Sequence, residues 1–192
     1  MGTDKSRLML GGRSFLEQIA GELSFVTPCV TVVGNTGATP QLKIPAVPDV
    51  YPRWGALGGV HAALAACSTV WALIVACDFP FVTRELFARL ASFREGAEAV
   101  APIQSDGIPQ PLCALYRVEP CLGRADHLIK SGERKPVALL QSVQTCWVSF
   151  AELSSLEGAD HFFDNVNTPE DYARASRKGS SSNDVSMSVE QD

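Results

Sequence analysis

The stretch WALIVACDFPFV, residues 71–82, decides the fold expected for this chain. It opens with an apolar run from Trp71 to Ala76, and Asp78 comes just before Phe79-Pro80. An apolar run of this length before a turn predicts a strand buried on both faces, as in a parallel sheet. A carboxylate at the carboxyl end of such a strand stands where open α/β sheets bind ligands. Asp78 is therefore a candidate Mg²⁺ ligand, and a cap of the following turn is the alternative.

Strand-like and helix-like segments alternate through most of the chain. Strands are expected at residues 29–33, 43–47, 71–76, 97–102, 111–117 and 145–150. Helices are expected at residues 14–23, 58–66, 83–90, 120–130 and 168–178, with a short amphipathic piece at 135–141. This order of elements predicts a three-layer α/β fold with a mostly parallel sheet and one antiparallel strand.

The length and composition fit one folded domain. The chain has 192 residues, of which 46% are hydrophobic and 19% charged, so it can build a real core. We expect this domain at residues 1–178. Residues 179–192 are rich in serine and lack apolar periodicity, so we expect a disordered tail there.

Charge and cysteine content limit the expected partners. The net charge is -5 and no basic stripe is present, so we expect no nucleic acid and instead a small anionic substrate. The six cysteines are scattered without a C-x-x-C pair, which is typical of thiols in a reducing compartment. The longest apolar run is far too short to span a membrane, and no signal-peptide pattern opens the sequence. We therefore expect a cytoplasmic protein without a membrane partner.

Three further segments contain candidate ligands for an anion. Lys5 could bind phosphate as a point charge, although a solvated lysine is favoured on composition alone. Asp49 follows a strand and Pro48 and could bind a base or ribose, but Pro-Asp is also ordinary turn chemistry. Residues 55–59, GALGG, precede a helix and offer backbone N–H groups to an anion, without the spacing of a dinucleotide motif or P-loop.

Asparagines and histidines give weaker indications. Asn165 and Asn167 lie on the loop before the last expected helix, where amide oxygens could approach a metal, and asparagine also simply favours turns. Asn167 is the better candidate of the two. The histidines at 61, 127 and 161 share no ligand spacing, so we interpret them as surface or packing residues.

Together, these segments resemble the molybdenum cofactor guanylyltransferases, which are MobA-like nucleotidyltransferases. The C-D-x-P-F element around Asp78 is shared by several nucleotidyltransferases, whereas the G-x-L-G-G, QPLCALYR and N-V-N-T-P-E-D elements are more specific in this order. The matching segments cover nearly all of the expected domain: MGTDKSRLMLGGRSFLE at 1–17, PDVYPRWGALGGVHAAL at 48–64, VACDFPFV at 75–82, QPLCALYR at 110–117, SGERK at 131–135 and NVNTPEDYARA at 165–175.

The resemblance implies a Rossmann-like nucleotidyltransferase sandwich and a specific reaction. GMP would pass from Mg-GTP to the terminal phosphate of Mo-molybdopterin, with release of pyrophosphate. The implied cofactor is Mg²⁺, and the implied substrates are GTP and Mo-molybdopterin. Proteins that deliver molybdopterin, and molybdoenzymes that receive the product, are further expected partners.

The resemblance also implies roles for particular side chains. Asp78 would bind the metal and Lys5 the nucleotide phosphates, so these two are the expected catalytic residues. The remaining implied contacts are Asp49 to the nucleotide, Gly34 or Asn35 to the guanine or ribose, and Asn167, with Asn165, on the metal and pterin side.

The sequence departs from the family pattern at its start. Relatives normally carry a strand and a phosphate-wrapping loop, L-A-G-G-x-S-x-R, just before M-G-x-D-K, and this sequence opens at the methionine of that motif. A start codon assigned too late explains this better than a truncated form. We therefore expect the chain as written to bind GTP poorly and to be inactive, and upstream codons to restore guanylyl transfer.

Three other functions remain open from the sequence. A cytidylyltransferase acting on molybdopterin or on another small phosphate or alcohol would use the same chemistry. A degenerate paralogue would bind nucleotide or pterin without catalysis, which the missing loop would suit. A receiver-like binding module is disfavoured, because no cluster of acids follows an early strand.

Overall fold

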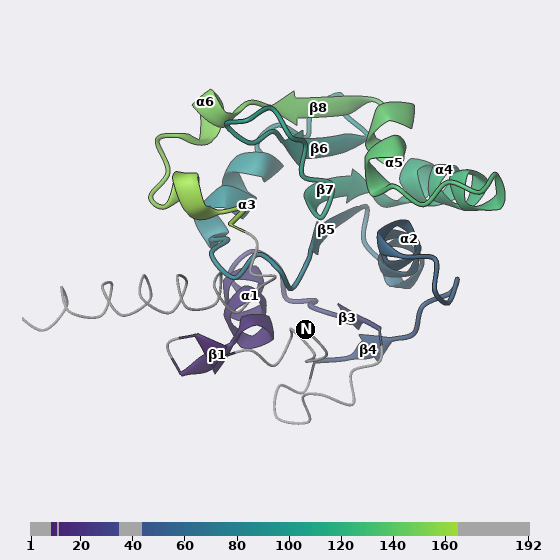
Figure 1. The fold of residues 1–192 in the computed structure, drawn as a ribbon, viewed down its shortest axis with the longest axis horizontal. Coiled ribbons are helices and arrows are strands. Elements are labelled where there is room, and N and C mark those ends of the chain that lie inside the picture. The colour runs from purple at the N-terminus through teal and green to yellow at the C-terminus, as the bar shows by residue number, and fades with distance from the viewer. Residues whose placement is uncertain (1–8, 11, 35–43, 165–192) are drawn as a thin grey trace, which may run out of the picture.

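The computed structural model describes residues 9–10, 12–34 and 44–164 (Figure 1). Its strands are β1 (Met9–Leu10), β2 (Arg13–Ser14), β3 (Val32–Val33), β4 (Ala46–Val47), β5 (Trp71–Val75), β6 (Ala99–Pro102), β7 (Cys113–Arg117) and β8 (Thr145–Val148). Its helices are α1 (Phe15–Ser24), α2 (Ala56–Ala66), α3 (Arg84–Ala91), α4 (Val118–Lys130), α5 (Pro136–Ser142) and α6 (Phe150–Leu153), followed by the 3-10 helix η2 (Ala159–His161). None of the helices in these ranges is long and apolar enough to cross a membrane.

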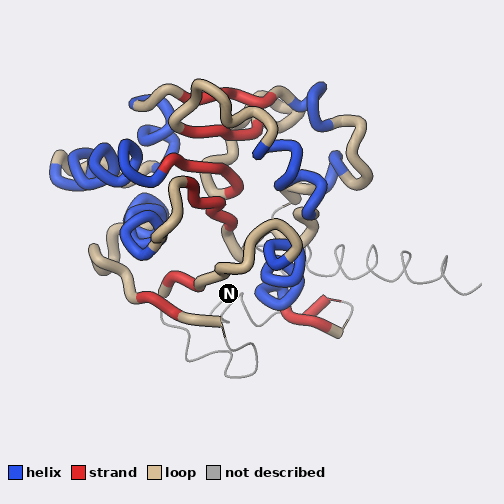
Figure 2. The backbone as a smooth tube through the Cα atoms, turned by 180° about the vertical axis from the view of Figure 1, so that it is seen from behind, coloured by secondary structure: helices blue, strands red, loops and turns tan. Residues whose placement is uncertain are grey.

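The main sheet is mixed and contains one antiparallel strand. Its order is β5-β7-β6-β8, in which β7 runs antiparallel to both β5 and β6, and β6 is parallel to β8. Strands β5, β6 and β8 therefore share one direction. β3 and β4 form a separate parallel pair, and Figures 1 and 2 both place this pair beyond β5, on the side away from β7. The predicted α/β fold class is confirmed, and β7 is the expected antiparallel strand.

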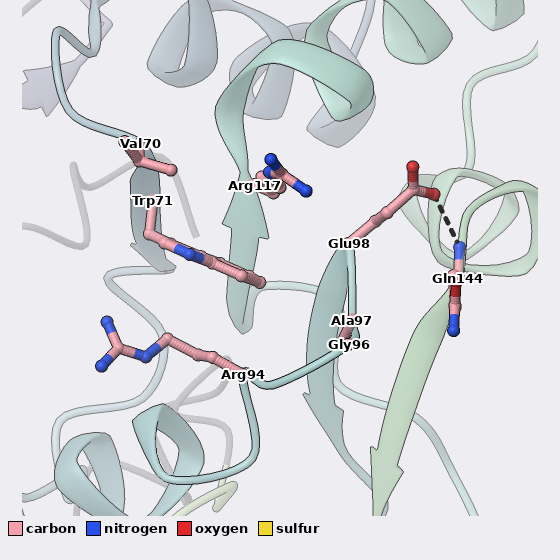
Figure 3. Close-up of a pocket in the computed structure, with 8 residues that line it drawn as sticks. All are labelled: Val70, Trp71, Arg94, Gly96, Ala97, Glu98, Arg117 and Gln144. Atoms are coloured by element: carbon pink, nitrogen blue, oxygen red, sulfur yellow. Dashed lines mark hydrogen bonds between the residues drawn. The ribbon is translucent and has the colours of Figure 1, made fainter.

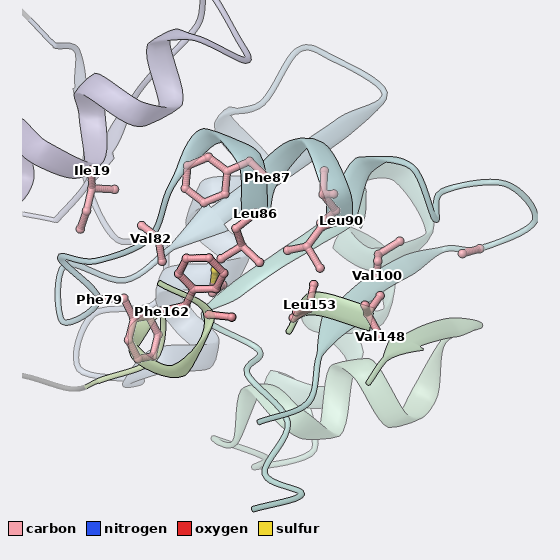
Figure 4. Packing of buried hydrophobic residues seen from close by; sticks show 14 residues of the cluster. Ile19, Phe79, Val82, Leu86, Phe87, Leu90, Val100, Val148, Leu153 and Phe162 are labelled. Atoms are coloured by element: carbon pink, nitrogen blue, oxygen red, sulfur yellow. The ribbon is translucent and has the colours of Figure 1, made fainter. Parts of the chain in front are cut away.

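Helices cover both faces of the main sheet and complete three layers. On one face, α1, α3 and α6 enclose an apolar cluster that includes Leu86, Phe87, Val100 and Leu153 (Figure 4). On the other face, α2, α4 and α5 pack on the sheet. The strand residues beneath these three helices are mostly small: Ala72, Ala99, Ala101 and Ala114. Small residues on both surfaces let α2 pack closely on the sheet, as its Ala- and Gly-rich sequence predicts.

β5 is less buried than the sequence predicted. Only Ala72 is buried, and the other residues of the strand are half-buried. Within the described ranges β5 pairs with β7 alone, so its second edge carries no strand. Both faces of the strand nevertheless pack into apolar clusters, Leu73 and Val75 into one and Ala72 and Ile74 into the other, so the expected cover on both faces is confirmed and only the degree of burial is lower.

Local signals account for the helix starts. Ser14 Oγ accepts from the Glu17 N–H (3.2 Å), and the Glu17 carboxylate accepts from the Ser14 N–H (2.6 Å), which forms a capping box for α1. Thr83 Oγ1 accepts from the Leu86 N–H (3.4 Å) and caps α3, as predicted. The expected helix at 168–178 and the tail at 179–192 lie outside the described residues.

Candidate functional site

Asp78 lies in the turn after β5, at the carboxyl end of the strand, as predicted. The N–H of Ala76 donates to the carbonyl of Leu112 (2.8 Å), and the N–H of Phe79 donates to the carbonyl of Ala76 (3.3 Å). Phe79 and Pro80 are buried, whereas Asp78 is half-buried. The turn is thus anchored by its neighbours, and its carboxylate lies at the carboxyl edge of β5.

The first turn of α2 lies at the same edge of the sheet. α2 leads into β5 through a short connection and packs against it, so the helix begins near the end where β5 finishes. Its N-cap, Gly55, has φ 74° and ψ -153°, a conformation that is essentially restricted to glycine. No side chain caps the helix, and no acid stands in its first turn. The first amides of α2 are therefore suited to an anionic ligand.

The expected base-contacting region lies at the carboxyl ends of β3 and β4. The N–H of Gly34, just after β3, donates to the carbonyl of Val47 at the end of β4 (2.9 Å). Asp49 follows two residues later and is exposed. Because α2 packs against β3, β4 and β5, it joins this region to the edge that carries Asp78.

The chain returns to the Asp78 turn near the end of the described part. The ring of Phe163 meets the ring of Phe79 edge to face, with centroids 6.0 Å apart. Phe162 beside it is fully buried. This packing brings the segment that ends at Asp164 next to the turn. The other predicted site residues, Lys5, Asn35, Asn165 and Asn167, lie outside the described residues.

A polar cluster that the sequence did not predict ties the loop before α2 to α4. Tyr51 Oη donates to Asp126 Oδ1 (2.5 Å), and Lys130 Nζ donates to Asp126 Oδ2 (2.5 Å). The bonds from Lys130 and Tyr51 lower the pKa of Asp126, and the bond to Asp126 raises the pKa of Tyr51. His61 is buried with its ring edge-on to Tyr51, 4.9 Å between centroids, and burial lowers its pKa. The interpretation of His61 as a packing residue is confirmed.

A second set of contacts holds the same loop at Trp54. Trp54 Nε1 donates to the carbonyl of Glu133 (2.8 Å), and the guanidinium carbon of Arg134 lies 4.6 Å from the Trp54 ring centroid. Arg134 Nη1 also donates to the carbonyl of Arg53 (3.3 Å). The partners are 79 residues apart, so the only sequence signal for this contact was that both ends fall in segments that resemble the family.

The donors at this edge fit Mg²⁺ better than a metal held by protein ligands alone. In the part of the chain that the structure describes, no group of three His, Cys, Asp or Glu side chains could hold a metal ion. Asp78 offers one carboxylate, and Mg²⁺ is commonly held by one or two carboxylates with substrate phosphates completing the octahedron. Among the described residues, Asp78 could therefore hold Mg²⁺ together with a phosphate ligand and water.

A separate pocket of about 370 Å³ lies at the opposite end of β5, where the strand begins (Figure 3). Its lining includes Trp71 at the start of β5 and Arg117 at the end of β7, with Arg94 nearby. The Glu98 carboxylate in its wall accepts from the Gln144 N–H (2.9 Å). Because β5 starts here and Asp78 follows its other end, this pocket is not part of the candidate site.

Comparison with known sequences agrees with this geometry. Residues 1–146 match the family model described as the MobA-like NTP transferase domain. The chain is 30% identical over 174 residues to the molybdenum cofactor guanylyltransferase of Vibrio atlanticus, which covers 88% of this chain and 85% of the relative. It is 27% identical over 175 residues to the protein of the same name from Vibrio cholerae, with 90% and 83% covered.

Solved structures show the same fold. The molybdopterin-guanine dinucleotide biosynthesis protein A of Archaeoglobus fulgidus superposes with a TM-score of 0.77 at 25% identity, covering 94% of this chain and 92% of that chain. The 2-C-methyl-D-erythritol 4-phosphate cytidylyltransferase of Thermus thermophilus superposes with a TM-score of 0.69 at 20% identity, covering 92% and 94%. The second likeness concerns the fold alone.

Proposed function

Because the chain belongs to the MobA-like NTP transferase family, it is a nucleotidyltransferase, and we propose that it transfers GMP from Mg-GTP to Mo-molybdopterin. The observation that carries this proposal is the edge shared by Asp78 and the uncapped first turn of α2. Asp78 would supply a carboxylate oxygen for a cation, and the first turn of α2 would supply backbone N–H groups for an anion. A metal-bound nucleoside triphosphate needs both.

The proposed step is a displacement at the α-phosphorus of GTP. A terminal phosphate oxygen of molybdopterin forms a bond to that phosphorus, and the bond from the phosphorus to the oxygen bridging to the β-phosphate breaks. Pyrophosphate leaves with the electron pair. The attacking oxygen already carries charge at neutral pH, so no general base is needed. Positioning and charge neutralisation therefore dominate catalysis.

The chain's own residues would divide these tasks. Asp78 would hold Mg²⁺, whose role when bound is to offset negative charge on the phosphates. Lys5 would bind the triphosphate, and Asp49, with Asn35, would contact the nucleoside. Asn167, following the segment that packs beside the Asp78 turn, would serve the metal and pterin side.

Asp78→Asn tests the proposal directly. The substitution keeps the side-chain volume and removes the charge, so we expect the rate of transfer to fall by at least about a hundredfold. The measurement is pyrophosphate release with Mg-GTP and Mo-molybdopterin, together with mass-spectrometric detection of the dinucleotide product. Glu157→Gln is the matched control, because Glu157 is an exposed carboxylate on the segment before η2. Full activity of Asp78→Asn would sink the assignment.

The same assay separates the alternatives. Faster turnover with CTP than with GTP would make the chain a cytidylyltransferase. If the upstream-extended chain releases pyrophosphate with neither nucleotide, a non-catalytic binding protein is favoured. The assay is run on the 192-residue chain and on a chain extended by the upstream codons, which also tests the expectation that the short chain is inactive.

A further inference from the structure

The loop that leads into α2, residues 51–55, is held unusually close to the helix it precedes. A Cβ atom placed on Gly58 would lie 2.9 Å from Trp54 Cβ and 3.3 Å from the Tyr51 carbonyl oxygen. Real Cβ atoms do not approach other atoms that closely, so only glycine fits at position 58 without moving this entry loop. The position of the entry loop and the position of the first turn of α2 are therefore linked.

The other side of the entry loop is fixed by α4 and the turn after it. Asp126 on α4 accepts the Tyr51 hydroxyl, and the Glu133 carbonyl accepts the Trp54 indole N–H. The turn is itself rigid, because Glu133 Oε1 accepts from the N–H groups of Arg134 (2.7 Å) and Lys135 (2.8 Å). The entry loop is thus held at Tyr51 and at Trp54 by α4 and the turn that follows it.

The loop also carries strained backbone that needs such a support. Arg53 has φ +63° and is the only non-glycine residue with a positive φ in the described ranges. Strain of this kind persists only where surrounding contacts enforce it. Arg134 supplies one such contact, because it bonds the Arg53 carbonyl and stacks on Trp54. Strained backbone next to a ligand-binding turn is a common form of preorganisation.

We propose that Asp126 and Arg134 are positioning residues for the nucleotide: through the entry loop they keep the first amides of α2 aimed at bound nucleoside triphosphate. The inference rests on the proposed function, because it assumes that this helix start binds the nucleotide. Neither side chain touches the reacting atoms. Their loss should therefore weaken nucleotide binding and leave the chemical step intact.

The variants Asp126→Ala and Arg134→Ala test this role. We expect each to raise the dissociation constant of Mg-GTP about tenfold, which corresponds to about 1.4 kcal/mol. Turnover at saturating GTP should change less than about twofold, and the KM for molybdopterin should stay the same. Isothermal titration calorimetry with Mg-GTP gives the dissociation constant in the 192-residue chain and in the upstream-extended chain, and steady-state kinetics give turnover and KM in the upstream-extended chain.

Two controls separate positioning from a general loss of structure. Asp126→Asn keeps an oxygen that accepts from Tyr51, so its affinity for Mg-GTP should remain close to that of the unmodified protein. Arg124→Ala removes an exposed cation from the same helix and should have no effect on affinity. Irreversibly unfolded protein would lower the number of binding sites and the apparent turnover number and would leave the dissociation constant unchanged. Reversible unfolding would raise the apparent dissociation constant, so urea unfolding of each variant checks that the native state is fully populated.

The outcomes distinguish this inference from the proposed function. Binding of Mg-GTP by the unmodified protein with equal affinity in Asp126→Ala and Arg134→Ala would overturn the positioning role alone. Parallel losses in Arg124→Ala would attribute the effect to net charge and would overturn it as well. Failure of the unmodified chain, in both lengths, to bind Mg-GTP would overturn both proposals.

Discussion

His61 is a buried titratable residue whose ionisation opposes folding. Its Nδ1 has no hydrogen-bond partner in the part of the chain that the structure describes, and its Nε2 is 4.0 Å from Asp126 Oδ1. Burial lowers the pKa of His61, which outweighs the opposite effect of Asp126. The unfolded chain therefore binds a proton at this site at a higher pH than the folded chain does. Stability should fall as the pH falls through about 6.5, the unfolded pKa of histidine.

His61→Leu removes this titration while keeping an apolar side chain of similar size. We expect the unmodified protein to lose more unfolding free energy between pH 7.5 and 5.5 than His61→Leu does, measured by urea unfolding at both pH values. Asp126, whose lowered pKa makes it titrate below its usual range, contributes only at more acidic pH. His127→Gln is the control for replacing a histidine whose side chain is exposed, on α4. Equal slopes for the unmodified protein and His61→Leu would contradict the assignment.

Single residues differ in how far the sequence alone could place them. Asp78 was placed correctly at the end of β5, because an apolar run and a following Pro are local signals. The bond between Tyr51 and Asp126 spans 75 residues of sequence, and no local pattern encodes such a contact. Lys5 and Asn167 remain predictions, because both lie outside the described residues.

At the scale of elements, α3 depends on two caps, one of them from another helix. Thr83 Oγ1 accepts from the Leu86 N–H, and Glu22 Oε2 on α1 accepts from the Arg84 N–H (2.8 Å). We expect Thr83→Ala to lower the unfolding free energy by about 1 kcal/mol, measured by urea unfolding. Thr83→Ser keeps the hydroxyl and should lose much less. An equal loss in both variants would assign the effect to the threonine methyl group rather than to the cap.

Helices were predicted better than strands, for a physical reason. α1 and α3 carry apolar spacing and a side-chain N-cap within their own sequence, and α4 carries apolar spacing, so their positions follow from local signals. The length of a strand depends on the neighbouring strands with which its backbone can pair. The β-rich run at 29–33 forms only the two residues of β3, because in the described ranges it pairs solely with the equally short β4. The helix α6 was missed; it begins at Phe150, the last residue of the strand expected at 145–150.

At the scale of the molecule, the strands that the structure describes form separate sheets, with β3 and β4 paired apart from the sheet that contains β5. α2 packs against β3, β4 and β5 and so connects the two sheets. The three-layer arrangement was predictable from alternating elements. The short separate pair of β3 and β4 was not, because no local pattern encodes which strands lie next to each other. The half-buried side chains of β5 follow from this arrangement.

Among the described residues, no strand pairs with the second edge of β5, and hydrogen exchange can test this residue by residue. The N–H of Val118 donates to the carbonyl of Val70, and the N–H of Ala76 donates to that of Leu112. In an antiparallel ladder the backbone N–H groups point alternately to one neighbour and to the other. The N–H groups of Ala72 and Ile74 therefore point to β7, whereas those of Leu73 and Val75 point to the opposite edge of the strand.

We therefore expect the amides of Leu73 and Val75 to exchange more than about a hundredfold faster than those of Ala72 and Ile74, measured by NMR-detected hydrogen exchange in the 192-residue chain. The amides of β7 are an internal control, since that strand has partners on both sides. Equal protection of all four β5 amides would mean that another segment covers this edge, and the separation of the two sheets would not hold in solution. Protection that arises only in the upstream-extended chain would assign the covering strand to the added residues, because an extended segment between β3 and β5 can hydrogen-bond to both.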